Sequence, residues 1–221
     1  MAKRTASRRK RQPDVTRERL LQAAFEEIYR RGFQGASLET ILGQAGVTKG
    51  ALYHHFPDKA ALGYAVVDDV VRNLLLERWL GVLEAQPGDP LTALQGMLQQ
   101  RLAELEPHEV ELGCPLNNLG QEMSPLDERF RRRVAATVET WTNGFAAALK
   151  RGQTDGSVRR DLNPKQVATF LVAAIEGSYG LAKSARSTGM LRSNLEVLSS
   201  FLEFLRPDRK PRPQRSRRAR S

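Results

Sequence analysis

The sequence predicts an all-α protein of about nine helices, with a small N-terminal three-helix head and a larger C-terminal helical bundle. Apolar residues recur at intervals of three and four, and the strict alternation typical of strands is nearly absent. Helix-capping residues stand between the apolar runs. The 221 residues, 40% of them hydrophobic, are enough for one large domain or two small ones with real cores.

The three helices of the predicted head are short and close together in the sequence. Thr16 is expected to cap the first helix, and Gly32 to end it. Ser37 caps the second, and Thr48 caps the third, which runs to about His54. Gly46 lies in a tight turn between the second and third, as in helix-turn-helix units.

The remaining helices are expected to be longer. The fourth should run without a break to about Gln86, and residues 106–113 should form a loop. Six further helices are expected, and a capping residue or a proline marks the start of each. The expected starts are at Asp58, Asp89, Cys114, Ser124, Asn163 and Ser193.

The predicted domains are a basic N-terminal arm (1–13), the head (14–74), the bundle (75–205) and a basic disordered tail (206–221). The net charge of +10 is concentrated at the two ends, because residues 1–11 hold six basic residues and no acid, and residues 206–221 hold eight against one acid. Such arms usually contact nucleic acid. The alternative is an end that only improves solubility.

The single cysteine, Cys114, excludes an intrachain disulfide and favours a reducing cytoplasm. No apolar run reaches the length of a membrane span, and no secretory signal follows the basic N-terminus. We therefore expect a cytoplasmic protein without a membrane partner.

The strongest functional signal is the run SLETILGQAGVTKGALYHHFPDK over residues 37–59. Its apolar residues can fill a small core between two short helices, which leaves the other face of the third helix for DNA. Small residues at Gly50 and Ala51 allow close approach to a major groove. The expected contacts with phosphates or base edges come from Ser37, Thr48, Lys49, Gly50, Ala51, Tyr53, His54 and Lys59.

This run, with the helix before it, resembles the DNA-binding domain of the TetR family over roughly residues 14–74. The resemblance implies a repressor released from a palindromic operator by a small-molecule inducer. It also implies a homodimer, with helices at about 164–185 and 193–205 forming a four-helix interface, and a ligand cavity among the fourth to eighth helices. Residues 113–131 resemble a segment found in one group of these regulators, including electrophile-responsive ones.

The inducer is expected to be largely apolar. A pocket could be lined by Trp141, Phe145, Phe170 and Tyr179, although plain core packing is the default interpretation of their helical spacing. Possible polar contacts are Asn117, Asn118, Gln121 and Glu122.

Cys114 has two interpretations. At the start of a predicted helix, free N–H groups would favour its thiolate, as in an electrophile sensor. A lone cysteine is also often a small buried apolar residue, and Glu109 and Glu111 would raise the pKa of the thiol if they lie nearby.

Two other classes of protein remain to be compared. An enzyme is disfavoured because no nucleophile–base arrangement, phosphate loop or zinc spacing can be identified, so no cofactor, metal or catalytic residue is expected. Asp68 and Asp69 are interpreted as a solvated patch rather than a metal pair. A helical adaptor with RNA-binding tails would explain the arms but not the run over residues 37–59.

Overall fold

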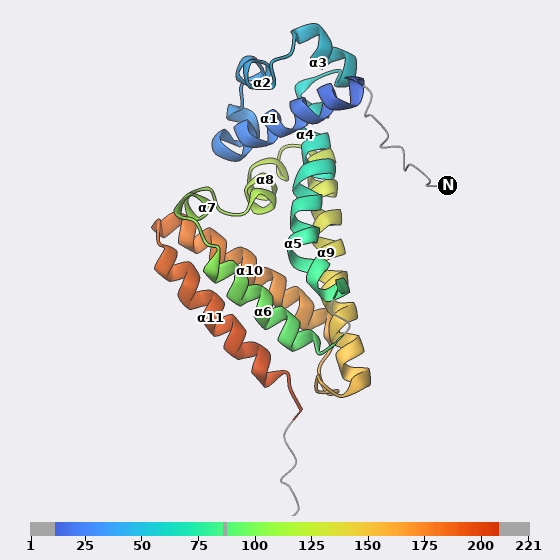
Figure 1. Cartoon of the computed structure of the whole chain (residues 1–221), viewed down its shortest axis with the longest axis vertical. Helices are drawn as coiled ribbons and strands as arrows, with labels where there is room; N and C mark the ends of the chain where they lie inside the picture. The colour runs from blue at the N-terminus through green and yellow to red at the C-terminus, as the bar shows by residue number, and fades with distance from the viewer. Residues whose placement is uncertain (1–11, 86–87, 208–221) are drawn as a thin grey trace, which may run out of the picture.

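The computed structural model describes residues 12–85 and 88–207, and within these residues the chain is helical without a strand (Figure 1). The predicted all-α class is confirmed. Residues 1–11 of the basic arm and 208–221 of the basic tail lie outside the described residues. Within the described ranges, no helix is both long and apolar enough to cross a membrane.

The head consists of α1 (Gln12–Gly35), α2 (Leu38–Ala45) and α3 (Lys49–His55), which lie together at one end of the molecule (Figure 1). The α1 helix begins before Thr16, so the predicted cap at Thr16 is wrong. Gly32, the predicted end of the first helix, instead interrupts α1, which continues to Gly35; its positive φ of 76° is a conformation that glycine adopts without strain.

A continuous helical rod links the head to the bundle, here called the body (Figure 1). It comprises α4 (Lys59–Ala65), a π-helical turn η1 (Val66–Val71) and α5 (Arg72–Ala85), and the residues at both junctions keep helical φ and ψ. The predicted unbroken fourth helix is therefore confirmed, with a π turn inside it. Such turns are often found at functional sites.

Six further helices complete the body. In Figure 1, α11 and α10 lie side by side, and α6 packs against α11. The six are α6 (Pro90–Ala103), α7 (Pro107–Leu112), α8 (Pro115–Met123), α9 (Glu128–Asp155), α10 (Pro164–Ala185) and α11 (Thr188–Phe204).

Three predicted boundaries in the body are wrong, each for a local reason. The α7 helix replaces the expected loop at 106–113, with Pro107 at its first position. The long helix expected from Ser124 begins after Asp127, whose carboxylate accepts from the N–H groups of its first turn. The last helix begins after Ser187 rather than Ser193, because the Ser187 hydroxyl accepts from the Met190 N–H.

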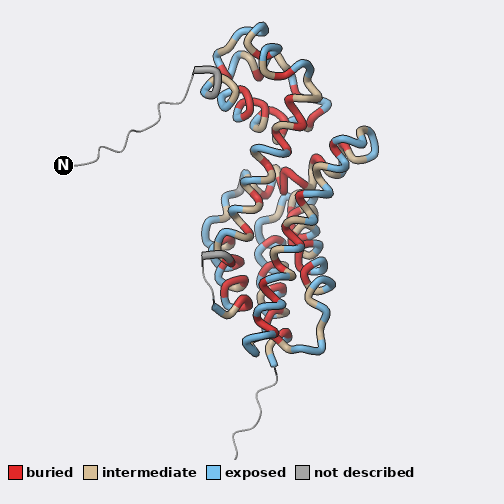
Figure 2. The backbone as a smooth tube through the Cα atoms, turned by 90° about the vertical axis from the view of Figure 1, so that its right-hand side faces the viewer, coloured by how far each residue is buried: buried red, intermediate tan, exposed pale blue. Residues whose placement is uncertain are grey.

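Buried residues follow the inner faces of the body helices and form a smaller group in the head (Figure 2). The centre of the body is aromatic. Trp79 stacks on Trp141 with ring centroids 5.4 Å apart, and Phe145 meets Trp141 edge-on. These rings hold α5 against α9, so the rod that carries the head is fixed within the body core.

A second aromatic cluster joins head to body. Phe33 of α1 and Tyr64 of α4 both meet the buried ring of Phe130 on α9, with centroids 4.7 and 4.8 Å apart. The Tyr64 hydroxyl donates to Asp127. A side chain at Gly63 would lie 2.4 Å from Phe33, so the close packing of this junction requires glycine there.

Candidate DNA-binding surface and ligand cleft

The position of α3 is set by caps at the turn that precedes it. Gly46 ends α2 in the left-handed conformation, with φ of 60°. The Thr48 hydroxyl then accepts from the Ala51 N–H at 3.2 Å and starts α3. The Ser37 hydroxyl likewise accepts from the Thr40 N–H at 3.3 Å and starts α2. The capping roles of Ser37 and Thr48 are confirmed.

The two faces of the helix-turn-helix divide as predicted. Ile41, Ala45, Leu52 and Phe56 are buried, and Val47 is half-buried. Of the predicted DNA contacts on the opposite face, five are exposed, namely Thr48, Lys49, Gly50, Tyr53 and His54, and Ala51 is half-buried. The exposed face of α3 therefore presents polar groups to a partner, while the opposite face of the helix packs against the buried core.

Lys59 lies elsewhere. Its ammonium donates to the Gln34 carbonyl at 3.1 Å and sits 5.0 Å from the centroid of the Phe33 ring. The Lys59 side chain therefore joins α4 to the end of α1, and its expected role as a phosphate contact gains no support from this position.

The head and body also meet through α8. The two carboxylate oxygens of Glu122 accept from the backbone N–H groups of Phe33 and Gln34, both at 2.8 Å, just after the interruption at Gly32. The Tyr29 hydroxyl donates to the carbonyl of Gly113, at the end of α7. These bonds make the position of α1 sensitive to any movement of α8.

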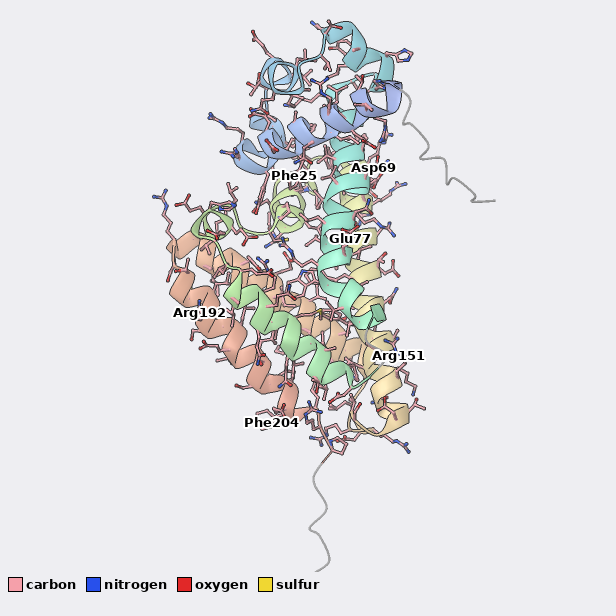
Figure 3. The ribbon with its side chains drawn as sticks, viewed as in Figure 1. Phe25, Asp69, Glu77, Arg151, Arg192 and Phe204 are labelled. Carbon is pink, nitrogen blue, oxygen red and sulfur yellow. The ribbon has the colours of Figure 1, made fainter. Side chains whose placement is uncertain are left out.

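An open cleft of about 650 Å³ lies between α1, η1, α8 and α10. It is called the cleft below. Figure 3 places Phe25 on the side of α1 that faces the body. The predicted polar contacts Asn117, Asn118, Gln121 and Glu122 all line this cleft, although it contains none of the four predicted aromatic residues. Its volume is in the range of small-molecule sites.

A much smaller cavity of about 10 Å³, the inner pocket, lies behind the cleft and shares Tyr29 and Pro115 with it. Cys114, Glu176 and Tyr179 line the inner pocket. One oxygen of Glu176, Oε2, is buried without a hydrogen-bond partner among the described residues. The buried Tyr179 hydroxyl faces Arg101 without a hydrogen bond of ordinary geometry.

Burial controls the ionisation of this pocket. It raises the pKa of Glu176 to about 7 and is opposed by a hydrogen bond with Cys114. The pKa of the Cys114 thiol lies well above its ordinary value, mainly because the thiol is buried and also because it faces the Glu176 charge. Of the two interpretations of Cys114, activation by the helix N-terminus is therefore disfavoured, because desolvation outweighs it.

The remaining predicted pocket residues are placed differently. Trp141 and Phe145 are fully buried core rings, and the cavity beside Phe145 measures about 10 Å³, too small for a ligand. Phe170 is 52% exposed on the surface of α10, where it meets Phe201. These three assignments to a ligand pocket are corrected, because the spacing of apolar residues does not distinguish core, pocket and surface.

Asp68 and Asp69 are both exposed, as their interpretation as a solvated patch requires, and each has an ion-pair partner. Asp68 pairs with Arg133 of the body at 2.9 Å, and Asp69 pairs with Arg17 of the head. Among the described residues, no group of three or more His, Cys, Asp or Glu is arranged to hold a metal. Because the two carboxylates are on η1, the π turn is bonded to both parts of the molecule.

Sequence reasoning missed several residues of these cavities, including Tyr29, Glu176 and Lys183. None of the three belongs to a local motif. They come from α1 and α10, and they meet the residues of α8 only in the folded chain.

Comparison with known proteins gives consistent matches along the chain. Residues 20–66 match the family described as bacterial regulatory proteins, tetR family, and residues 90–198 match the tetracyclin repressor-like C-terminal domain. The transcriptional repressor DhaR of Mycobacterium sp. (strain GP1) is 30% identical over 187 residues, which cover 84% of this chain and 88% of DhaR. The transcriptional regulator AcuR of Cereibacter sphaeroides is 32% identical over 178 residues, covering 77% of this chain and 78% of AcuR.

The fold agrees with these matches. The crystal structure of the reduced form of E. coli NemR has a TM-score of 0.74 at 27% identity, covering 86% of this chain and 96% of that one. The helix-turn-helix geometry, the two family matches and the identity with DhaR show that the chain belongs to the TetR family of DNA-binding transcriptional regulators.

Proposed function

We propose that the protein is a dimeric repressor that binds a near-palindromic operator and leaves it when a small molecule enters the cleft. The observation that carries the proposal is the exposed polar face of α3 on a buried support. In this proposal Thr48, Lys49, Tyr53 and His54 contact phosphates or base edges in a major groove. The exposed Gly50 and half-buried Ala51 let the helix backbone approach the groove.

The proposed dimer uses α10 and α11. Both helices expose large apolar side chains, and those on α11 recur every seven residues: Phe170 and Leu181 on α10, and Met190, Val197 and Phe204 on α11. An apolar stripe over two adjacent helices is suited to pairing with its own copy about a two-fold axis. Such a dimer would present two α3 helices to half-sites about one turn of DNA apart, or a multiple of a turn.

Release requires a link between ligand and head. A molecule in the cleft touches α1, α8 and the two ends of η1 at Val66 and Val71. Movement of α8 would disturb the bonds from Glu122 to Phe33 and Gln34, and so change the spacing of the two heads. The coupling needed is modest, on the order of 1–3 kcal/mol.

Two features remain sequence-based proposals. The basic residues 1–11 are proposed to add affinity for any DNA through phosphate contacts. Sensing by Cys114 is the alternative mode of response, but the raised pKa of the buried thiol favours a non-covalent ligand. A cytoplasmic location accords with both the operator and the free thiol.

The test is footprinting of the full chain on the DNA upstream of its own gene, followed by gel shifts on the protected site. We expect a two-fold symmetric footprint. Lys49→Ala should weaken binding about 10-fold or more, because charged contacts to DNA are strong, whereas the control Lys150→Ala, on an exposed position of the body, should bind as wild type. A symmetric footprint with equal binding by both variants would remove α3 from the DNA interface.

A further inference from the structure

We infer that the cleft is a receptor for a small amphipathic anion, a monocarboxylate on an apolar skeleton, with the Lys183 ammonium as its anchor. The inference rests on the proposed ligand-released repressor and specifies the class of its ligand.

The charges that line the cleft are unbalanced. Three cations, Arg30, Arg31 and Lys183, face one carboxylate, Glu122. Both oxygens of Glu122 already accept from backbone N–H groups of α1. Arg30 and Arg31 have no ion-pair or hydrogen-bond partner among the described residues, and both are exposed at the cleft. The lining therefore has an excess of positive charge even with Glu122 counted, and the cleft attracts negative charge.

Lys183 is held ready for an anion by neutral neighbours. The side chain is half-buried, and its stem packs against Gly113, where a Cβ would come within 3.0 Å of the Lys183 Cδ. The ammonium donates to the Asn118 side-chain oxygen at 2.9 Å, and Asn118 in turn donates to the Leu112 carbonyl at 2.7 Å. An ammonium has three donors, so two remain for a ligand. A carboxylate here would gain charge-assisted hydrogen bonds in a partly desolvated place.

The rest of the cleft favours an apolar skeleton. Six apolar side chains line it, namely Phe25, Ile28, Val66, Val71, Pro115 and Leu119. The volume of about 650 Å³ suits a small organic molecule. A purely apolar ligand would cover Lys183 and leave its charge with Asn118 but without an anionic partner, at a cost in free energy. The inducer expected from the sequence was largely apolar. The cleft specifies it further, as an apolar molecule with a single anionic end.

Lys183 is also connected to the bonds that would control release of the head. Asn118, the partner of Lys183, lies one helical turn before Glu122 on α8. A carboxylate that draws the ammonium away from Asn118 acts on the same helix that bonds to α1 through Glu122. Binding at Lys183 can therefore bias α8 toward the position that releases the head.

The experiment uses the full chain and two matched pairs of probes, octanoate with octan-1-ol and 4-phenylbutyrate with 4-phenylbutan-1-ol. Binding is measured by titration calorimetry, and operator release by fluorescence anisotropy. We expect at least one carboxylate to bind about 10-fold or more tightly than its alcohol. Lys183→Gln should weaken carboxylate binding by about 10- to 100-fold and leave alcohol binding unchanged.

Two further variants distinguish the loss of the Lys183 charge from a general effect of substitution on the structure. Lys183→Arg keeps the charge and should retain most of the carboxylate affinity. Lys165→Gln removes an exposed lysine of the same helix, bonded to Asn143, and should bind the probes as wild type. Thermal unfolding of each variant shows that it is folded.

Three results would overturn the anion site: no carboxylate binding at millimolar concentration, equal binding of carboxylates and alcohols, or unchanged carboxylate affinity in a folded Lys183→Gln variant. Operator release by an alcohol alone would refute the anion and leave the ligand-released repressor standing. Carboxylate binding by a protein that shows no symmetric footprint would retain the site and refute the repressor.

Discussion

The surface of α3 that we propose meets DNA and the inner pocket of the body hold their polar groups in opposite conditions. Tyr53 and Lys49 are exposed on a helix capped by Thr48 and supported by buried Leu52. Glu176 and its neighbours in the inner pocket are enclosed around about 10 Å³. The α3 surface can therefore meet DNA without rearranging, whereas a ligand that reaches the inner pocket must move side chains or helices. In the proposed function, DNA is recognised by a preformed surface, and the ligand acts on an interior that must deform.

The π turn η1 lies between these two regions. Val66 and Val71 border the cleft, Asp69 pairs with the head, and Asp68 pairs with the body. Sharp bends of long helices are found at π turns, so we propose that a ligand in the cleft acts on the rod by changing its bend at this point.

The largest effect is expected where the two regions are joined. Phe130→Ala should lower the free energy of unfolding by about 3–5 kcal/mol, because it removes a fully buried ring that touches Phe33 and Tyr64. Urea unfolding followed by far-ultraviolet circular dichroism measures it. The control is Leu126→Ala, an exposed apolar residue nearby in the sequence, which should change little. A loss below about 1 kcal/mol for Phe130→Ala would mean that head and body are not joined through this ring.

A second prediction concerns the interior and its pH dependence. In the unfolded chain Glu176 ionises at its ordinary pKa of 4.5, whereas burial keeps it protonated in the folded chain up to about pH 7. The folded state thus binds more protons between these values, so its stability should fall as pH rises through this window. The contribution of Glu176 to that fall is on the order of 3 kcal/mol.

Glu176→Gln should remove this part of the decline, because a glutamine stays neutral at both ends of the window. The free energies of unfolding at pH 5 and pH 8 should therefore differ less in the variant than in wild type. The exposed Glu139→Gln is the control and should follow wild type. Parallel pH profiles for wild type and Glu176→Gln would contradict the buried, protonated carboxyl.

A third prediction concerns the preformed surface. Tyr53→Ala should weaken operator binding by about 10-fold while the melting temperature stays near that of wild type, because the ring is 44% exposed and lies against the exposed Lys49 ammonium. Gel shifts and thermal unfolding measure the two quantities. Tyr53→Phe separates the hydroxyl from the ring. Loss of stability in Tyr53→Ala would show that the α3 surface is not independent of the fold.

The head was predictable because its signals are local. Caps at Ser37, Thr48 and Asp58 and the turn at Gly46 each act within a few residues, and all four are confirmed. The ligand cavities were predictable only in part. Asn117 and Asn118 line the cleft, but Lys183, which bonds to Asn118, comes from a distant helix and meets it only through the fold.

Apolar spacing was the weakest guide. Phe145 and Phe170 belong to similar helical repeats, yet one lies in the core and the other on the surface proposed for the dimer. A face that pairs with a second copy has the same composition as one that packs within the chain, so the sequence of one chain does not distinguish them.

The smallest effect is expected at Cys114, and it tests whether the interior responds by covalent chemistry. Only the thiolate attacks an alkylating agent, and the raised pKa of this buried thiol leaves little thiolate at neutral pH. N-ethylmaleimide should therefore modify the native chain far more slowly than the urea-unfolded chain, as followed by mass spectrometry. Cys114→Ala should bind operator and release it with the same ligands as wild type. Rapid modification that releases operator from wild type but not from Cys114→Ala would make the thiol the sensor. Slow modification without release leaves Cys114 as a packing residue, and the response of the interior then depends on what binds in the cleft.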